Sequence, residues 1–314
     1  MIARLRQIKN GYVFENEPLR KYTRFDLGGP AAVLFDTEDE EAFVEALRLI
    51  AELGAPHLVI GGGTNLVVAD EGFAGVVLRY RGAAIQRDGM RLMAAAGAVL
   101  QDVVDASIDY AFQGMATMTG IPGYLGGAVY GNAGAYGNSM DEVVERVRFF
   151  ADGEVRTMSN EECEFTYRES IFKRQKEWVV LGAELRFAPG NKEELAHAAQ
   201  GIRKVRDAKY PPEMKCAGSI FKNLLLATLP PEVSGGIPPA VTKGGKVPSA
   251  WFLEQVGAKG LRRGDIQVAP YHANLIYNDG AGTTRDLVSV IRELKGCVCE
   301  RFGILLEEEV QYVG

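Results

Sequence analysis

The feature that most limits the possible folds of this chain is a run of glycines at residues 119–137, with seven glycines in 19 positions. A shorter cluster lies earlier in the chain, at residues 61–63. We call residues 61–63 the first glycine cluster and residues 119–137 the second. Because glycine lacks a Cβ atom, backbone amides in such segments can approach a phosphate or a flat ring. One interpretation is a series of tight turns packed against a sheet. The presence of two clusters favours a pair of loops that bind a ligand through their backbone.

The residues after the first cluster separate this chain from a Rossmann-type dinucleotide fold. In that fold the glycine turn opens a helix. Here the turn is followed by Leu-Val-Val at residues 66–68 and then by the turn-like Asp70-Glu71-Gly72. We therefore expect short strands at residues 58–60, 66–68 and 76–78.

Apolar periodicity and turn residues outline the remaining elements of an α+β protein. The helix expected at residues 37–53 begins with a capping box of Thr37 and Glu40 and ends before Gly54. The prolines of Tyr210-Pro211-Pro212 end another helix and mark the expected domain boundary. Further helices are expected at residues 101–112, 192–208 and 284–302, strands at residues 143–150, 179–187 and 304–313, a loop at residues 215–223 and an exposed stretch at residues 230–248.

The composition limits the partners of the chain. Its formal charge of -6 provides no broad positive field, so we expect no nucleic-acid binding. No apolar run approaches the about 20 residues of a membrane span, and residues 1–6 lack the apolar core of a secretory signal. Cys297 and Cys299 have no second ligand pair, so we expect no metal site. The expectation is a reduced, cytoplasmic monomer.

Six motifs occur in an order that is typical of one flavoenzyme family. They are Gly61-Gly-Gly-Thr-Asn-Leu66, Gly120-Ile-Pro-Gly-Tyr-Leu-Gly-Gly127, Asn132-Ala-Gly-Ala-Tyr-Gly137, Tyr167-Arg-Glu-Ser-Ile-Phe-Lys173, Gly218-Ser-Ile-Phe-Lys-Asn223 and Leu306-Glu-Glu-Glu-Val310. Each alone is weak, but together they resemble the UDP-N-acetylenolpyruvoylglucosamine reductase (MurB) family. The short interval between Arg168 and Ser219 resembles its shorter subclass, which lacks a loop with a substrate-clamping tyrosine.

This resemblance implies a fold and a reaction. Residues 1–80 and 81–210 would be two subdomains that bind non-covalent FAD, in a fold like that of vanillyl-alcohol oxidase. Residues 211–314 would bind the substrate and close over it, although the last strand could return to the FAD-binding part. NADPH would reduce the flavin, and the enolpyruvyl ether of UDP-N-acetylglucosamine would then be reduced to UDP-N-acetylmuramate. That reaction would serve peptidoglycan synthesis, and with it cell wall biogenesis, cell shape and cell division.

The resemblance also assigns site residues. Arg168, Ser219 and Glu309 match the catalytic positions of the family. Positions that contact the substrate are matched by Tyr167, Lys209 and Asn223. Positions that bind FAD are matched by Gly61, Gly62, Gly63, Thr64, Asn65, Leu66, Gly120, Ile121, Pro122, Gly123, Gly126, Gly127, Ala128 and Arg206.

The three catalytic residue types suit this chemistry. Addition of hydride to the β-carbon of an enolpyruvyl group leaves an enolate, which needs cationic or hydrogen-bonding partners. Arg168 offers a planar fork for a carboxylate. Glu309, as the protonated acid, would stabilise the enolate without adding a second negative charge. Ser219, held in contact with the α-carbon, would give it a proton.

Structural roles are also open for these residues. Glu164 and Glu169 are near enough in sequence to form a salt bridge with Arg168, and the Ser219 hydroxyl also suits a loop or a helix cap. The local sequence leaves both roles open for Arg168 and favours the structural role for Ser219. The choice of a catalytic role depends on the family resemblance.

The acidic run near the end of the chain leaves one assignment open. Alternation along a strand puts Glu307 and Glu309 on one face and Glu308 on the other. Strand geometry does not choose between the first two, and a solvated strand end would suit Glu307 and Glu308. The resemblance chooses Glu309. Gln311 stands where an arginine commonly follows in the family, which removes a charge near Glu309.

Two further departures and two rival functions remain. Gly131 replaces a bulkier residue, and residues 230–248 form a longer link than is usual in the family.

An FAD-linked oxidase could attach its flavin through a histidine, but His57 lies in an expected strand and suits a core or edge position. A catalytically silent sugar-nucleotide or flavin-binding relative is the second rival, and the presence of Arg168, Ser219 and Glu309 argues against it.

Overall fold

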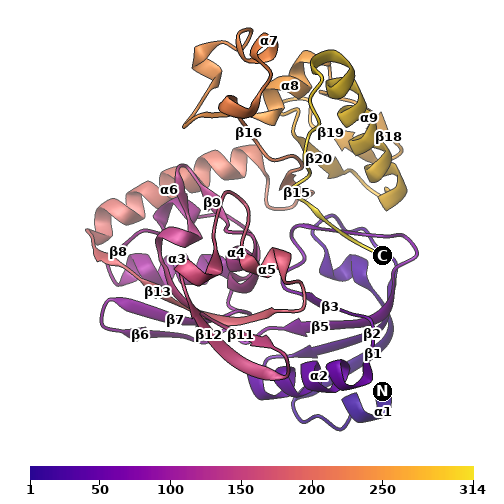
Figure 1. Ribbon diagram of the computed structural model, residues 1–314, viewed down its shortest axis with the longest axis vertical. Coiled ribbons are helices and arrows are strands. Elements are labelled where there is room, and N and C mark those ends of the chain that lie inside the picture. Colours follow the sequence, from indigo (N-terminus) through magenta and orange to yellow (C-terminus); the bar gives the residue numbers. More distant parts are fainter. The chain divides into compact units, whose positions relative to one another are not determined.

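The computed structural model describes residues 1–314 and contains two compact units, each built from separate stretches of the chain (Figure 1). The larger unit comprises Met1–Glu17, Ala31–Gly63 and Ala74–Ala208. The smaller unit comprises Pro18–Pro30, Thr64–Phe73 and Lys209–Gly314. The three-part division at residues 80 and 210 stays a prediction.

Two sheets form the larger unit. The first has the order β1-β2-β5-β3 and consists of β1 (Gly11–Pro18), β2 (Pro30–Thr37), β5 (Phe73–Tyr80) and β3 (His57–Ile60). The second has the order β12-β11-β13-β7-β6 and consists of β12 (Glu154–Ser159), β11 (Val144–Ala151), β13 (Val179–Arg186), β7 (Arg91–Ala95) and β6 (Ile85–Asp88). Neighbouring strands of the second sheet are antiparallel, whereas β3 and β5 are parallel. The strands predicted at residues 58–60, 76–78, 143–150 and 179–187 are therefore confirmed.

The helix α2 (Glu40–Leu53) covers the first sheet with its apolar face. Phe43, Leu47 and Ile50 are buried in one core with Phe35 of β2. The helix ends at Gly54, whose φ of 57° is the left-handed conformation that glycine adopts most readily.

The predicted start of α2 at Thr37 was wrong. Asp39 is the residue that caps the helix, because its carboxylate accepts from the Ala42 amide at 3.0 Å. The Thr37 hydroxyl is buried and donates to the Asn10 carbonyl at 2.7 Å. Thr37 therefore ends β2 instead of starting the helix.

The second sheet has its own core with α3 (Leu100–Asp109), α4 (Leu125–Tyr130) and α5 (Ile171–Arg174). α3 stops three residues before its predicted end, and Ala111 then takes a left-handed φ of 56°. Small elements complete the larger unit: α1 (Ile2–Leu5), β8 (Phe112–Gln113), β14 (Ala188–Pro189), β9 (Gly134–Ala135) and β10 (Asn138–Ser139).

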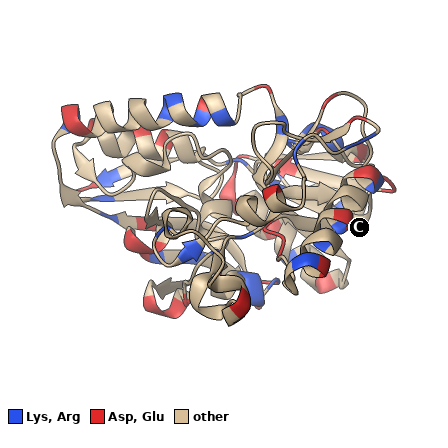
Figure 2. Cartoon of the chain, turned by 90° about the horizontal axis from the view of Figure 1, so that it is seen from above, with Lys and Arg blue, Asp and Glu red and all other residues tan.

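The long helix α6 (Lys192–Lys209) ends where the prolines after Tyr210 predicted. Ala199 is its only buried residue. Acidic residues stand in its first turn and basic residues follow toward its C-terminus, a pattern visible along the helix in Figure 2. Negative charges near the N-terminus and positive charges near the C-terminus interact favourably with the helix dipole. This interaction helps to stabilise α6, which buries little surface.

The smaller unit is built on a sheet of order β15-β20-β19-β18, covered by α8 (Ser249–Gln255) and α9 (Thr284–Phe302). Its strands are β15 (Lys215–Ser219), β20 (Leu275–Asn278), β19 (Ile266–Val268) and β18 (Arg262–Arg263). Two further pairs are β16 (Leu224–Leu225) with β17 (Lys246–Val247), and β21 (Gln311–Val313) with β4 (Leu66–Val68) in parallel. The predicted bounds of α9 and β4 are confirmed.

Three predictions for this unit were wrong. Residues 215–219 form a strand instead of a loop, since they pair with β20. Residues 230–248 include α7 (Pro231–Ser234) and β17, and bury Ile237 and Val247. The last strand covers only Gln311–Val313, because the preceding residues bond to the segment after β15 before the chain turns to β4.

The loop after β4 is tied to the start of α9. The Asp70 carboxylate accepts from the Thr284 and Arg285 amides at 2.8 and 3.0 Å. The Thr284 hydroxyl donates to the Val68 carbonyl at 2.6 Å. Asp70 thus satisfies amides that have no partner inside the helix and places a negative charge at its positive end.

No helix of the chain is both long and apolar enough to cross a membrane.

Asp70→Ala should lower the free energy of unfolding by about 1–2 kcal/mol, the usual effect of removing a helix cap. Urea titration followed by circular dichroism measures the change. Glu71→Ala is the matched control, because Glu71 is exposed and makes only a 3.6 Å ion pair with Arg285. Equal stability of the wild type and Asp70→Ala would contradict this role of Asp70.

Candidate functional site

In the larger unit the first glycine cluster is held by close packing. Gly61 follows β3, and the Tyr124 ring lies 3.5 Å from the position that a Cβ atom at Gly61 would take. Gly63 has a φ of 59°, which disfavours any side chain there. Arg79 of β5 donates to the Tyr124 hydroxyl at 3.0 Å. Tyr124 therefore connects the two predicted glycine loops, and no sequence pattern indicated this contact.

The second glycine cluster uses its glycines in different ways. The Gly120 amide donates to the Gln101 side chain at 2.7 Å, so this amide is already engaged. A Cβ atom at Gly126 would lie 2.9 Å from the Ala96 Cβ, which explains the need for glycine there. At Gly127 a Cβ atom would meet nothing within 4 Å. Gly126 is thus a packing glycine, whereas Gly127 leaves the backbone accessible.

Arg206 and Thr119 lie beside the same cluster. The Arg206 Cδ and Nε atoms are 3.1 Å from the Cβ position of Gly120, so Arg206 lies beside this loop, and its contact with FAD stays a prediction. The Thr119 hydroxyl is buried and makes no hydrogen bond. A buried hydroxyl without a partner is unusual and points to a missing acceptor. A phosphate of FAD would supply such an acceptor, so these residues fit that cofactor.

Arg168 is held in a strained conformation by the Asn132–Gly137 motif. Its φ is 60°, a left-handed value that costs about 1–3 kcal/mol for a residue other than glycine. Its guanidinium donates to the Gly134 carbonyl at 2.8 Å and lies 5.1 Å from the centre of the Tyr167 ring. The Asn132 amide fixes the adjacent chain by donating to the Thr166 carbonyl at 2.9 Å.

The two carboxylates near Arg168 in the sequence contact further basic side chains. Glu164 pairs with Arg174, and Glu169 lies 3.4 Å from Lys173. Lys173 also donates to the Arg168 carbonyl at 2.7 Å. Tyr167 and Arg168 are both half-buried. A half-buried guanidinium held over an aromatic ring remains suited to binding a carboxylate.

In the smaller unit, Ser219 ends β15 and lies near Glu309. Gly218, with a φ of 79°, provides the bend before Ser219. The next residue, Ile220, accepts from the Glu309 amide at 2.7 Å, and Phe221 bridges to Glu308. Two of the three predicted catalytic residues thus lie on neighbouring segments.

Asn65 joins this pair to the first glycine motif. Its side-chain amide donates to the Glu309 carbonyl at 2.8 Å, and its own carbonyl accepts from the Gln311 amide at 2.9 Å. Leu66 pairs with Gln311 between β4 and β21. The Gln311 side chain also donates to the Glu309 carbonyl, at 3.3 Å. In place of the expected arginine, Gln311 therefore adds a neutral bond to the Glu309 backbone.

The simple alternation predicted for the acidic run was wrong. Glu307 is exposed and pairs with Lys222, whereas Glu308 is half-buried and pairs with Lys295 at 2.7 Å. The reason is that residues 307–309 are not part of a regular strand. Glu309 is half-buried, and its choice as the catalytic glutamate stays a prediction from the family resemblance.

The predicted substrate residues of this unit lie at two places. Lys209 is beside Tyr210, with its ammonium 5.0 Å from the ring centre. The Asn223 side chain accepts from the Ser249 amide at 3.4 Å, at the start of α8. Tyr210 itself was predicted only as a helix end, yet its hydroxyl lies 3.3 Å from the Ser219 Oγ atom.

His272 lies beside this group and was not predicted as a site residue. Its ring is 6.3 Å from the Tyr210 ring, and its Nδ1 atom accepts from the Asn274 amide at 3.2 Å. Burial, assisted by the positive charge of Lys209, lowers the pKa of His272 to about 4. His272 is therefore neutral at pH 7.

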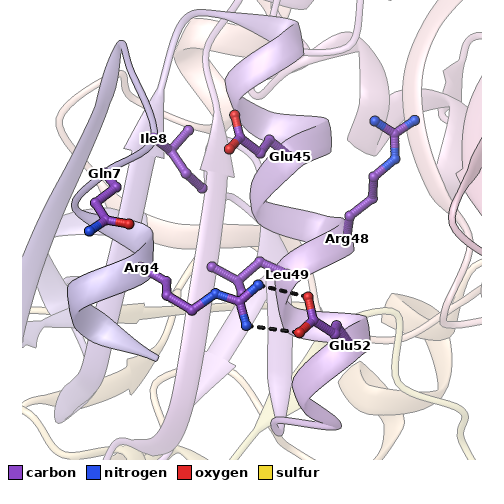
Figure 3. A pocket seen from close by; sticks show the side chains of 7 residues that line it. All are labelled: Arg4, Gln7, Ile8, Glu45, Arg48, Leu49 and Glu52. Atoms are coloured by element: carbon purple, nitrogen blue, oxygen red, sulfur yellow. Dashed lines mark hydrogen bonds and ion pairs between the residues drawn. The ribbon is translucent and has the colours of Figure 1, made fainter.

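A pocket elsewhere in the larger unit does not coincide with these residues. Figure 3 shows it between α1 and α2, with a volume of about 220 Å³. Arg4 spans it with hydrogen bonds of 2.8 and 2.7 Å to Glu52. Its lining is formed by Arg4, Gln7, Ile8, Glu45, Arg48, Leu49 and Glu52. None of the predicted site residues lies there, so we assign it no ligand.

His272 should make the fold sensitive to acid. In the unfolded chain a histidine titrates near pH 6.5, so the unfolded state takes up the proton first as the pH falls from about 6.5 to about 4. The wild type should therefore lose about 1–2 kcal/mol more stability between pH 7 and pH 5 than His272→Asn. Urea unfolding at both pH values measures this difference.

His197→Asn, a change at an exposed residue of α6, is the control and should leave the pH dependence of the wild type unchanged. The same pH dependence in His272→Asn and in the wild type would contradict the role of His272.

Comparison with known proteins confirms the family resemblance. Residues 30–159 match the FAD binding domain family, and residues 210–313 match the C-terminal domain of UDP-N-acetylenolpyruvoylglucosamine reductase. The reductase of that name from Solibacter usitatus is 55% identical over 311 residues, which cover 99% of this chain and 100% of the relative. That of Rubrobacter xylanophilus is 37% identical, over 95% of this chain and 94% of the relative.

A solved structure supports the same fold. The MurB reductase from Thermus caldophilus matches with a TM-score of 0.76 and 29% sequence identity, over 97% of this chain and 99% of that one. The α+β fold, with an FAD-binding part and a C-terminal reductase domain, is thereby confirmed. Full-length identity, matched domains and a shared fold agree, and the chain belongs to the UDP-N-acetylenolpyruvoylglucosamine reductase family.

Proposed function

We propose that this protein catalyses the NADPH-dependent, FAD-linked reduction of UDP-N-acetylglucosamine enolpyruvate to UDP-N-acetylmuramate in peptidoglycan precursor synthesis. Full-length similarity to reductases of that name supports the reaction. The structural observation that carries the assignment is the hydrogen bond from the Glu309 amide to the Ile220 carbonyl. It keeps a hydroxyl and a carboxyl group, the two proton-bearing groups that the reaction needs, on adjoining segments.

The two glycine motifs and their neighbours would hold the cofactor. The FAD that these residues would hold would supply the hydride-transfer chemistry between NADPH and the substrate. Gly127 leaves backbone accessible, and the buried Thr119 hydroxyl and the nearby Arg206 guanidinium suit phosphate oxygens. Thr119 joins the predicted FAD-binding residues on this basis. The predicted non-covalent attachment is consistent with His57, which opens β3 and has its Nδ1 atom 3.2 Å from the Ala55 carbonyl.

Arg168 would bind the substrate carboxylate and stabilise the enolate. Its left-handed backbone and the Gly134 carbonyl fix the guanidinium before substrate arrives, so little order is lost on binding. The planar fork can hold both carboxylate oxygens. The Tyr167 ring beneath it would contribute to the same binding surface.

Ser219 and Glu309 would act on the enolate. Ser219 would donate its proton to the α-carbon, which requires contact but no unusual acidity because the enolate is strongly basic. Glu309 would donate a hydrogen bond to the developing negative charge. Lys209 suits a phosphate of the nucleotide, and Asn223 would contact the same end of the substrate.

The finer biological setting is also part of this proposal. We expect the protein to act as a cytoplasmic monomer, with the UDP-sugar and NADPH as its small-molecule partners. Its product would serve cell wall biogenesis and, through it, cell shape and division. Size-exclusion chromatography with light scattering tests the monomer.

Spectrophotometry tests the reaction itself. The purified protein should be yellow, and its oxidation of NADPH should depend on the enolpyruvyl UDP-sugar. NADPH oxidation that is unaffected by this sugar would contradict the proposal. Flavin that remains on the acid-precipitated protein would instead support a covalent FAD-linked oxidase.

Ser219→Ala should separate the two halves of the reaction. Reduction of the flavin by NADPH should keep its rate, because no proton from Ser219 is needed there. Reoxidation by the enolpyruvyl substrate should slow by about 10³-fold, or about 4 kcal/mol, as expected for a lost proton donor. Stopped-flow absorbance measures both steps, and an unaltered reoxidation rate would rule out Ser219 as the donor.

Substitutions at two neighbouring glutamates should differ in effect. Glu309→Ala should slow reoxidation by about 10²–10³-fold, the usual effect of removing one donor to a developing oxyanion. Glu309→Gln keeps a neutral donor and should lose less. Glu307→Gln, at an exposed residue, is the control and should stay close to wild type. Equal losses at both positions would contradict the choice of Glu309.

A further inference from the structure

Tyr210, the residue that follows α6, lies beside the proposed proton donor. The Tyr210 hydroxyl lies 3.3 Å from the Ser219 Oγ atom, and both side chains are half-buried. The distance exceeds the about 2.7–2.8 Å usual between two hydroxyls. Catalytic contacts are often longer before the substrate engages. We propose that Tyr210 is a positioning residue that directs the Ser219 proton toward the substrate and returns a proton to Ser219. This inference rests on the proposed function.

The neighbours of Tyr210 fix its position. The Lys209 ammonium lies 5.0 Å from the centre of its ring, and the His272 ring lies at 6.3 Å. The Tyr271 hydroxyl donates to the Lys209 carbonyl at 3.1 Å, and Pro211 follows with a restricted backbone. A ring held in this way can keep its hydroxyl aimed at one partner.

The direction of the hydrogen bond decides what Tyr210 does. If Ser219 donated to Tyr210, its proton would point away from the substrate. If Tyr210 donates, the Ser219 oxygen is the acceptor and its own proton is free to point elsewhere. Only the second arrangement is compatible with transfer to carbon. His272 does not fill this role, because it is neutral at pH 7 and its Nδ1 atom accepts from Asn274.

The proton transfer balances through the two hydroxyls. The Ser219 O–H bond breaks as a C–H bond forms at the α-carbon, with the electron pair of the enolate. The Tyr210 O–H bond then breaks and the Ser219 O–H bond is restored. A phenol is a much stronger acid than an aliphatic alcohol, so the negative charge rests better on Tyr210. The Lys209 ammonium would stabilise the phenolate until water reprotonates it.

Tyr210→Phe tests this role, because it keeps the ring and its contact with Lys209. Flavin reduction by NADPH should be unchanged. Reoxidation of the reduced enzyme at saturating substrate should slow by about 10–100-fold, while the half-saturating concentration stays the same. A proton inventory of this step in mixed H₂O and D₂O should be curved for the wild type and linear for the variant. Tyr277→Phe is the control, since its hydroxyl donates to Gln267 at 2.9 Å.

A double variant distinguishes positioning from a structural effect. If Tyr210 acts through Ser219, then Tyr210→Phe should cause no further loss in the Ser219→Ala background, whereas a structural effect would add to the loss. A wild-type reoxidation rate and a curved proton inventory in Tyr210→Phe would overturn this inference alone. Additive losses of rate in the double variant would do the same. Failure of the wild type to be reoxidised by the enolpyruvyl UDP-sugar would overturn the proposed function, and this inference with it.

Discussion

The arrangement of the proposed catalytic groups depends on one short backbone ladder in the smaller unit. The Lys222 amide donates to the Glu307 carbonyl at 2.9 Å, and the Glu309 amide donates to the Ile220 carbonyl at 2.7 Å. Asn274, which is buried, both donates to and accepts from the Phe221 backbone at 2.9 Å. A buried amide with satisfied bonds specifies one local geometry, because leaving its groups unpaired would cost about 1–3 kcal/mol each. Ser219 and Glu309, about 90 residues apart in the chain, are adjacent because of this ladder.

Glycine has distinct structural effects in the larger unit. At Gly126 the Ala96 Cβ approaches too closely for a side chain, whereas Gly63 and Gly120 have left-handed backbone angles. Within residues 119–137, Gly127 is the glycine that has both open space at its Cβ position and no left-handed φ. The left-handed backbone of Arg168 also costs energy, and the contact of its guanidinium with the Gly134 carbonyl helps to hold it beside the same motif. The glycine-rich motif therefore combines close packing with access for a ligand.

Sequence patterns predicted elements whose stability is local. The amphipathic face of α9 predicted where that helix begins and ends, and the prolines after α6 predicted where α6 ends. Both signals depend only on neighbouring residues. Thr37 failed as a helix start because its hydroxyl bonds to Asn10, far along the chain. The irregular path of residues 307–309 and the Tyr210–Ser219 contact are likewise products of tertiary structure, which no periodicity encodes. Family resemblance named Ser219 and Glu309, but only the structure revealed their supports in Asn274, Asn65 and Tyr210.

The central claim is that an exchangeable proton from the smaller unit reaches the α-carbon after hydride has reached the β-carbon. Its most direct test is one turnover of the NADPH-reduced enzyme with the enolpyruvyl UDP-sugar in D₂O, followed by NMR of the product. A solvent deuterium is expected on the carbon that bears the carboxylate. Deuterium on the adjacent methyl group decides nothing, because the N–H of a reduced flavin also exchanges with solvent. A product without deuterium on the carboxylate-bearing carbon would contradict protonation of that carbon by an exchangeable group.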